Sequence, residues 1–375
     1  MALTALDFPA SPTNGQLYPD PPVTGQPQYS WNGSQWISSK AAVTQIARTD
    51  ALGWSGMQIN GSMEVSQERG TTPTSTFNTY VCDGWKMLMS GTMSIAGSQQ
   101  TQPYFPGMPW YLSVQIVTPQ ASIGAGDYAV IYQPIEGYRV ARLGWGTANA
   151  QPITIGFWSM HQITGVYSVS VVGSSDARSY TATYTHAVSN VAQYNTITIP
   201  GDTAGTSWAT GNATGLSLRF VMACGSTFIA PAANTWYGSN YIAAPGQVNG
   251  VASTGHFRIT GVVVLPGIEA PTAAQSPLIM RPYDQELTVC KRYWYRSISG
   301  LQTSAVNGVY YSVHAQHPVV MRAVPTMTTY GILQQVNFAT PLVEQIAADA
   351  YRCSAQANAN GQAGFLLVSN VDARL

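Results

Sequence analysis

Between residues 57 and 271, hydrophobic and polar side chains alternate along short segments that are bounded by Gly, Pro, Asn or Ser. A period of two is the pattern of a β-strand with one buried face. The segments that predict strands are Tyr111–Val117, Ile153–Met160, Tyr167–Val172, Tyr180–Tyr184, Asn195–Ile199, Leu216–Val221 and His256–Leu265. Short strands separated by tight turns predict an all-β fold, an antiparallel jelly-roll sandwich of about eight strands or more over residues 57–280.

The alternation also predicts the core-facing side of two of these strands. The apolar faces expected in the core are Ile153, Ile155 and Phe157 in one strand and Leu216, Leu218 and Phe220 in the other. The opposite faces, expected outside the core, are Thr154, Gly156 and Trp158, and Ser217, Arg219 and Val221.

The first 40 residues differ from the sandwich in being dominated by Pro and Asn-Gly turns. Tyr29–Trp31 and Gln35–Ile37 flank Asn32-Gly33, and Asn-Gly favours the positive φ of a type I′ turn, so this segment predicts a small hairpin. Forty residues bury too little apolar surface to be stable alone, so residues 1–40 are expected to pack on a partner or on copies of themselves. Residues 41–56 then form a linker, in which Ala41–Asp50 can form one short helix.

A helix and a second β domain are predicted after the sandwich. In residues 281–296, Asp284 can cap a helix that places Leu287, Cys290 and Trp294 on one stripe. Residues 297–375 return to strand patterns, in the segments Val309–His314, Met327–Ile332, Ala350–Ala355 and Gly364–Val368.

The chain carries little charge, and this excludes several classes of protein. Charged residues are 9% of the total, sixteen basic balance sixteen acidic, and only three lysines occur. A protein that binds duplex nucleic acid needs clustered cations, and a disordered chain needs low hydrophobicity with high net charge. A neutral polar exterior is typical of a protein that lives in an assembly or that contacts sugars.

Targeting and metal-binding patterns are missing from this sequence. The first residues lack a basic and a long apolar region, and no apolar run reaches the length of a membrane span. We therefore expect neither a secretory signal nor membrane insertion. The four cysteines form no CxxC pair, so they are expected to be reduced and buried, with no metal and no cofactor.

Catalytic motifs are sparse. The sequence lacks GxSxG, HExxH and a phosphate-binding glycine loop, and the pair His314 and His317 is a weak ligand signal. Paired carboxylates can cleave glycans, and the acids available within the sandwich are Glu64, Glu68, Asp83, Asp127, Glu136, Asp176 and Asp202. A protein without catalysis is the expectation, and a polysaccharide depolymerase is an alternative.

Loop aromatics are the more specific feature. The residues selected as candidates for carbohydrate binding are Trp145, Trp208, Trp236 and Tyr237, which lie in segments rich in Gly, Ser, Thr and Asn. Exposed aromatic rings can stack on sugars. The alternative is that these rings close the ends of the sandwich or lie in an oligomer interface, where Trp and Tyr are enriched.

Several segments together resemble one family. Ile59–Gly70 is similar to the INGDF-x-x-x-QRG opening of bacteriophage and prophage structural proteins of the tail-fibre class, except that Ser62 replaces the usual Asp and Glu68 precedes Arg69. Tyr80–Trp85 matches the family's Tyr-x-x-Asp-x-Trp, and Arg281–Tyr293 matches its RPY-x-x-E-L-x-x-C-x-R-Y close. Further matching segments are residues 154–158, 167–169, 178–180, 196–202, 234–236 and 318–326.

This resemblance covers nearly the whole chain and implies a virion protein, made in the host bacterial cytoplasm. It implies a jelly roll like a carbohydrate-binding module, a homotrimer, and adhesion to host surface glycan without catalysis, as in a tail fibre or spike. The N-terminus resembles phage attachment modules, so the residues expected to contact other virion proteins are Phe8, Pro12, Tyr29, Trp31 and Trp36. A head-decoration, head-fibre or collar protein with a purely structural role is the alternative; neither role needs nucleic acid as a partner.

Overall fold

The computed structural model describes residues 8–20, 28–38, 56–206, 208–344 and 346–375. The chain divides into two compact units, Met1–Ala51 and Leu52–Leu375. The first unit holds a three-stranded sheet of β1 (Leu17–Tyr18), β2 (Tyr29–Trp31) and β3 (Trp36–Ser38).

The hairpin predicted in the first unit is confirmed, but its turn differs from the expected one. Trp31 pairs with Trp36, so four residues form the loop where a two-residue type I′ turn was expected. The Asn32 side-chain oxygen accepts the backbone N–H groups of Ser34 and Gln35, both at 2.9 Å, and Gly33 adopts the positive φ of 96°. The helix expected over Ala41–Asp50 lies outside the described residues.

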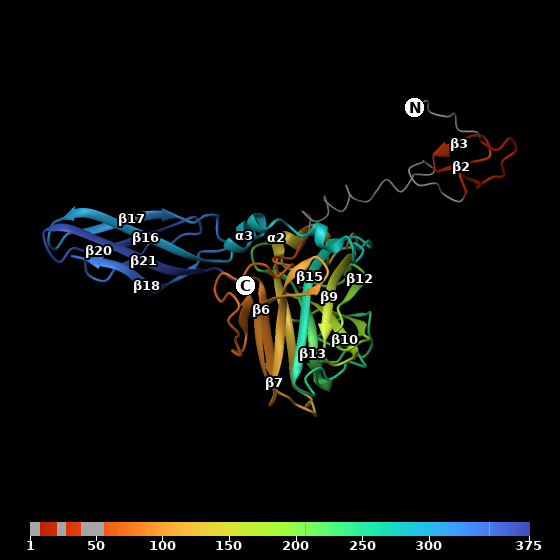
Figure 1. The fold of residues 1–375 in the computed structure, drawn as a ribbon, viewed down its shortest axis with the longest axis horizontal. Coiled ribbons are helices and arrows are strands. Elements are labelled where there is room, and N and C mark those ends of the chain that lie inside the picture. Colours follow the sequence, from red (N-terminus) through yellow and green to blue (C-terminus); the bar gives the residue numbers. More distant parts are fainter. Residues whose placement is uncertain (1–7, 21–27, 39–55, 207, 345) are drawn as a thin grey trace. The chain divides into compact units, whose positions relative to one another are not determined.

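Two antiparallel sheets form a jelly-roll sandwich in the second unit, as the sequence predicted (Figure 1). The seven-stranded sheet contains, in spatial order, β14 (Trp236–Tyr237), β11 (Ser179–His186), β10 (Gly165–Gly173), β13 (Thr214–Cys224), β8 (Tyr128–Glu136), β5 (Trp85–Ser90) and β4 (Thr79–Cys82). The five-stranded sheet contains β12 (Gln193–Ile199), β9 (Ile153–His161), β15 (Gly255–Pro266), β7 (Met108–Thr118) and β6 (Ser94–Phe105). The short helix α2 (Gly137–Val140) follows β8.

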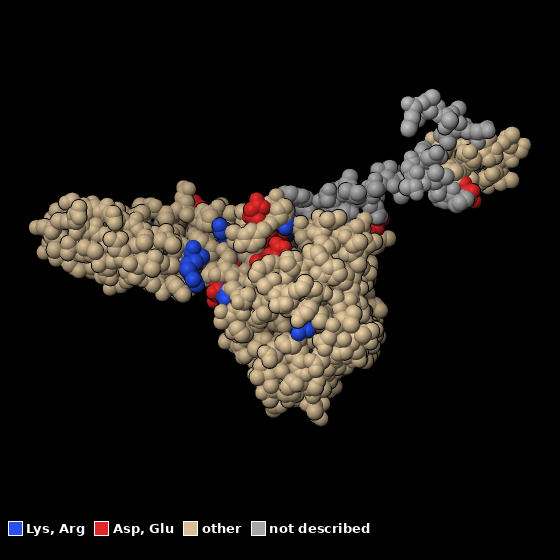
Figure 2. Space-filling view, viewed as in Figure 1, with Lys and Arg blue, Asp and Glu red and all other residues tan. Residues whose placement is uncertain are grey.

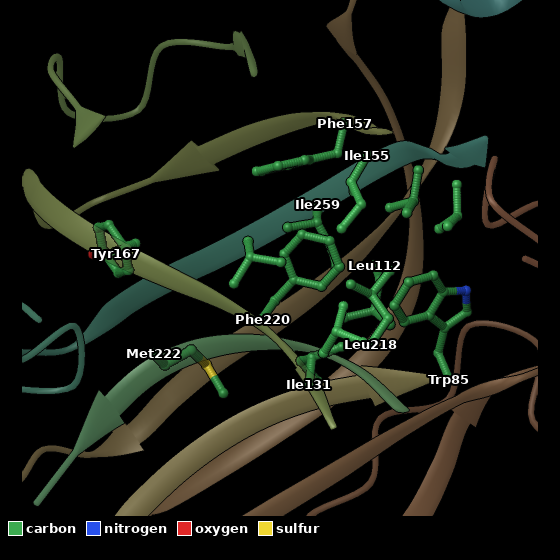
Figure 3. Close-up of a cluster of buried hydrophobic side chains, with 14 of the residues drawn as sticks. Trp85, Leu112, Ile131, Ile155, Phe157, Tyr167, Leu218, Phe220, Met222 and Ile259 are labelled. Carbon is green, nitrogen blue, oxygen red and sulfur yellow. The ribbon is translucent and has the colours of Figure 1, made fainter. Parts of the chain in front are cut away.

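The core lies between the two sheets, and the predicted inward faces supply it. Figure 3 shows Phe220 of β13 and Trp85 of β5 facing Ile155 and Phe157 of β9. The rings of Phe157 and Phe220 meet edge to face with centroids 4.9 Å apart, so they join the sheets across the interior.

The opposite faces of these strands, expected outside the core, are buried as well. Trp158 is 7% exposed and donates its indole N–H to the Ser276 hydroxyl at 2.9 Å, within a second apolar cluster. On the other sheet, Val221 packs with Ile242 and Ala243. Segments 268–281 and 226–244 cover the outer faces of the two sheets. The hydrophobic alternation within one strand cannot predict this, because the covering segments are distant in sequence.

A smaller β-sandwich follows α3 (Tyr283–Lys291). One sheet contains β16 (Trp294–Ala305), β21 (Gly361–Asp372) and β18 (Thr326–Val336), and the other contains β17 (Tyr310–Gln316), β20 (Ala350–Gln356) and β19 (Leu342–Glu344). The helix is shorter than predicted: its N-cap position is Pro282, Asp284 lies in its first turn, and Trp294 begins β16. Pairing of Trp294 with Asp372 in β21 outweighs the local helical pattern.

Ion pairs concentrate where α3 and β16 meet the larger sandwich. The buried Glu286 carboxylate of α3 accepts Arg281 at 3.0 Å and the backbone N–H of Asn60 at 2.7 Å. Arg292 donates to the buried carboxylate of Glu136 at 2.7 Å, and Arg374 pairs with Glu68. Figure 2 shows charged surface atoms gathered around this region, with few elsewhere on that face.

A buried histidine cluster lies on the inner faces of β9 and β11. The His161 ring stacks on Phe257 with centroids 3.9 Å apart, and its Nε2 is 2.8 Å from the Tyr184 hydroxyl. The backbone N–H of His161 donates to Nε2 of His186, which requires that nitrogen to be unprotonated. Burial, with the neighbouring His186, lowers the pKa of His161 well below its ordinary value, and burial also lowers the pKa of His186.

We predict that Glu286→Gln destabilises the protein by about 3 kcal/mol, because it leaves the Arg281 guanidinium buried without its counter-charge. Urea unfolding measures the change. The matched control is Glu344→Gln, which breaks the partly exposed pair with Arg352 and is expected to leave the midpoint nearly unchanged. Equal midpoints for the two variants would contradict a structural role for the buried pair.

We predict that stability falls as the pH is lowered from 7 to 5. His161 stays neutral in the folded state and binds a proton in the unfolded state, which costs about 1.4 kcal/mol for each pH unit below about 6.5. Calorimetric melting across this range measures the slope. His161→Gln should reduce the slope, with the remainder coming from other buried histidines such as His186, whereas His314→Gln, at an exposed position, should leave it unchanged. A wild-type melting temperature that is constant over this range would contradict the prediction.

Candidate functional site

Three of the four candidate sugar-binding aromatics come together at one end of the larger sandwich. Trp145, Trp208 and Trp236 meet edge to face, with ring centroids 4.7 to 5.5 Å apart. Trp145 is 9% exposed and belongs to the main core, and the other two rings pack against that core. Tyr237 follows Trp236 in β14 and contacts Tyr241.

The indole N–H groups of this tryptophan cluster all donate within the protein. Trp145 donates to the Gln151 carbonyl, Trp236 to the Pro200 carbonyl, and Trp208 to the Asp202 carboxylate at 2.9 Å. Arg178 pairs with the same carboxylate through two hydrogen bonds of 2.6 and 2.8 Å. Burial alone would raise the pKa of Asp202, but the hydrogen bonds from Arg178 and Trp208 outweigh it and lower that pKa.

This geometry favours closure of the sandwich end over sugar binding for the tryptophan cluster. The rings cover one another's faces, and their polar atoms are already paired. A stacking platform needs a ring face that is open to solvent. Carbohydrate binding by these aromatic residues stays a prediction.

A different site lies on the outer face of the seven-stranded sheet. It is a cleft of about 110 Å³, which holds roughly four water molecules. Its lining comes from three strands, the β10–β11 turn and segment 226–244, and consists of Leu88, Tyr128, Val130, Asp176, Arg219, Phe228, Asn240 and Ile242. This sheet-face cleft therefore has apolar, aromatic and polar sides.

The polar side of the sheet-face cleft is organised by Arg219 of β13. One terminal nitrogen donates to Asp176 Oδ1 at 2.6 Å and the other to Asn240 Oδ1 at 3.0 Å. Arg219 is 8% exposed, whereas the Asp176 side chain is half exposed. The guanidinium is thus held in place and neutralised, while the carboxylate and amide beside it remain within reach of a ligand's hydroxyl groups.

The aromatic side is formed by Tyr128 and Phe228, whose rings meet edge to face at 5.5 Å. Next to Arg219 across the sheet, Tyr132 donates its hydroxyl to Asn78 at 2.9 Å. Burial is the main cause that raises the pKa of Tyr132 to about 12, so this phenol remains a neutral hydrogen-bonding group. A cleft with an aromatic wall, neutral overall charge and fixed polar groups suits a sugar.

Sequence reasoning did not find this cleft. Arg219 was placed on the outward face of its strand and Asp176 among the sandwich acids, but neither was joined to the other. The available signal was a single arginine in an otherwise uncharged strand. The sequence carried no signal for Phe228 and Asn240, because it is the fold of segment 226–244 that brings them to the cleft.

The residues expected to attach the protein to a virion form an aromatic cluster in the first unit. Phe8 stacks on Trp36 with centroids 5.0 Å apart and meets Tyr29 edge to face, and Trp31 contacts Trp36 at 5.7 Å. Pro12 lies partly exposed nearby in sequence. The rings pack on one another and remain partly exposed, and attachment to a virion stays a prediction.

The described part of the chain has neither a metal-ligand cluster nor a membrane-crossing helix. No group of three or more His, Cys, Asp or Glu residues within those ranges is arranged to hold a metal ion. None of the helices there combines the length and apolar character of a membrane-crossing segment. The four cysteines are buried, free thiols.

Comparisons with known proteins give only distant structural similarities. No protein-family model and no curated protein matches the chain. The enzymatically active domain of bacteriophage CBA120 tailspike protein 4 aligns at 11% identity and a TM-score of 0.30, over 58% of this chain and 23% of the tailspike chain. This chain therefore spans about a quarter of that tailspike chain's length.

Two other similar structures are aligned over nearly their whole length. A putative sugar-binding protein from Bacteroides thetaiotaomicron has 7% identity and a TM-score of 0.32, over 56% of this chain and 99% of the other. A family 11 carbohydrate-binding module from Clostridium thermocellum has 10% identity and a TM-score of 0.25, over 53% and 98%. At scores this low the similarity carries no functional argument.

We predict that Trp208→Ala lowers stability by about 2 kcal/mol, because it removes two edge-to-face contacts and a donor to the buried Asp202 carboxylate. Denaturant unfolding measures the loss. Tyr138→Ala is the matched control, since that ring in α2 is exposed and should leave stability unchanged. Full stability of Trp208→Ala together with lost glycan binding would instead identify Trp208 as a sugar-stacking residue.

Proposed function

We propose that this protein is a structural component of a bacteriophage particle, a tail fibre or spike, that adheres to host surface glycan without catalysis. The sheet-face cleft binds the glycan, residues 1–40 dock to other virion proteins, and the protein assembles as a homotrimer. Its place is the virion, after synthesis in the host bacterial cytoplasm.

The observation that carries glycan adhesion is the chemistry of the sheet-face cleft. Asp176 and Asn240 offer acceptors and donors next to a guanidinium whose charge is already balanced. Tyr128 and Phe228 supply ring edges and faces to the apolar side of a sugar. A neutral site of this kind favours uncharged sugar hydroxyls over phosphate, which would require an unpaired cation.

The lining of the sheet-face cleft also supports adhesion over cleavage. Glycoside hydrolysis usually employs two carboxyl groups on either side of the scissile bond. Of the eight residues that line this cleft, Asp176 is the one carboxylate, and it is paired with Arg219. A binding role matches this composition.

The virion part of the proposal is supported by the resemblance of the INGS, YVCDGW and RPYDQELTVCKRY segments to tail-fibre-class proteins. The number of exposed hydrophobic side chains supports it as well. Eleven of the twenty-two large hydrophobic side chains that are exposed in the described residues lie within 297–375. Apolar surface of that density is expected to be covered in an assembly.

We predict that Asp176→Asn weakens glycan binding about tenfold to a hundredfold, because a charged acceptor is lost while the shape is kept. A microarray of bacterial surface polysaccharides and neutral oligosaccharides identifies bound glycans, and equilibrium titration with them measures affinity. Phe228→Leu, which keeps apolar volume but removes the aromatic ring, should also weaken binding. Melting temperatures show whether each variant is folded, and Glu344→Gln is the distant control.

Two results would overturn the proposal. One is a wild-type protein that binds no glycan, or folded cleft variants that bind like the wild type. The other concerns assembly and location in the virion. A stable 40 kDa monomer in sedimentation would contradict the trimer. Isolated particles that antibodies to this chain do not label would contradict a virion component.

A further inference from the structure

The smaller sandwich carries a second polar hollow, on the outer face of the sheet formed by β16, β21 and β18. This trough has a volume of about 420 Å³ and is lined by Gln302, Thr303, Ser304, Gln334, Val336, Gln362, Ala363 and Gly364. It holds roughly fourteen water molecules, which is room for a short oligosaccharide. No charged side chain belongs to its lining.

The strand register explains how the trough forms. Gln302 of β16 and Val336 of β18 both pair with Gly364 of the central strand. Because Gly364 has no side chain, it forms the floor of the trough, and the side chains of the two flanking strands form its walls. A Cβ at this position would lie 3.1 Å from Gln302 Cγ, so even alanine would begin to fill the floor.

The polar groups of the trough are weakly engaged with one another. The Gln302 amide reaches toward the Gln334 oxygen over a distance of 3.5 Å, at the outer limit of a hydrogen bond. Gln302, Gln334, Gln362 and Ser304 are all exposed. Each amide carries two donors and one acceptor, so three amides around one floor can exchange bound water for a ligand's hydroxyl groups.

The surroundings select an uncharged ligand. The nearest arginine along β16 is Arg296, about 20 Å from Gln302 along the strand, and its guanidinium lies over the Tyr330 ring at 3.7 Å. Phosphate, sulfate or a sugar acid in the trough would meet no cation. A neutral chain of hydroxyl groups satisfies the amides without desolvating a charge.

We propose that this amide-lined trough is a second site for neutral polysaccharide. The inference rests on the proposed function, and it adds a second contact with the same polymer. Arg292, which follows α3, pairs with Glu136 of β8, and Arg374, which follows β21, pairs with Glu68, so ion pairs join the smaller sandwich to the larger one. Two linked weak sites bind a long polymer far more tightly than either site binds a fragment.

The test uses the full chain with the trough variant Gln302→Ala/Gln362→Ala, the cleft variant Asp176→Asn, and their combination. The probes are the neutral polysaccharide that the array identifies and its two- and three-ring fragments. The trough variant should lose about a hundredfold in affinity for the polymer while it keeps the fragment affinity of the cleft. Gln316→Ala, an exposed glutamine on the opposite sheet, is the matched control and should bind like the wild type.

The outcomes separate the two proposals. Polymer affinity that depends on Asp176 alone overturns the trough and leaves the cleft standing. Absence of glycan binding in the wild type overturns the proposed function itself. Should the trough variant change sedimentation without changing polymer affinity, the trough is a contact between copies of this chain, and the second-site proposal is wrong. Gly364→Ala, which raises the floor but keeps every amide, should reproduce the affinity loss.

Discussion

The burial of paired charges between the two sandwiches is the interaction on which the rest of the second unit depends. Glu286 and Glu136 are almost completely buried, and each is held by an arginine from the segment that joins the modules. A buried pair adds little net stability, but the loss of one partner is costly, so the pairs enforce one arrangement of the joint. In a chain with 9% charged residues, charged side chains gather around this joint on the face that Figure 2 shows.

A neutral surface decides what kind of recognition is possible. Long-range steering of an ionic partner is weak, so binding has to come from hydrogen bonds to uncharged groups and from contact with apolar faces. The sheet-face cleft and the amide-lined trough both have this chemistry, with Arg219 neutralised by Asp176 in the first and no ion at all in the second. Both lie on the outer face of a sheet, and in the cleft Arg219 of β13 holds the loop residues Asp176 and Asn240 by hydrogen bonds.

Covering the outer faces of the sheets has a structural and a functional consequence. Segment 226–244 buries Val221 and Val130 beneath Ile242, and where it passes Arg219 it leaves the cleft open. The loop therefore completes the core and supplies Phe228 and Asn240 as two walls of the candidate site. The three tryptophans that the sequence selected as sugar-binding candidates pack together at the end of the sandwich, and their binding of sugar stays a prediction.

The sequence by itself determined the all-β class, the positions of the principal strands and the hairpin around Asn32, because these depend on local periodicity and turn chemistry. It placed Phe157 and Phe220 correctly in the core for the same reason. Only the tertiary structure decided that Trp158 is covered on its outer side and that Trp294 enters a strand. It also decided that Arg219 meets Asp176 and Asn240. Each of these outcomes rests on a contact with a segment distant in sequence, whose energy exceeds the local preference and leaves no pattern among neighbouring residues.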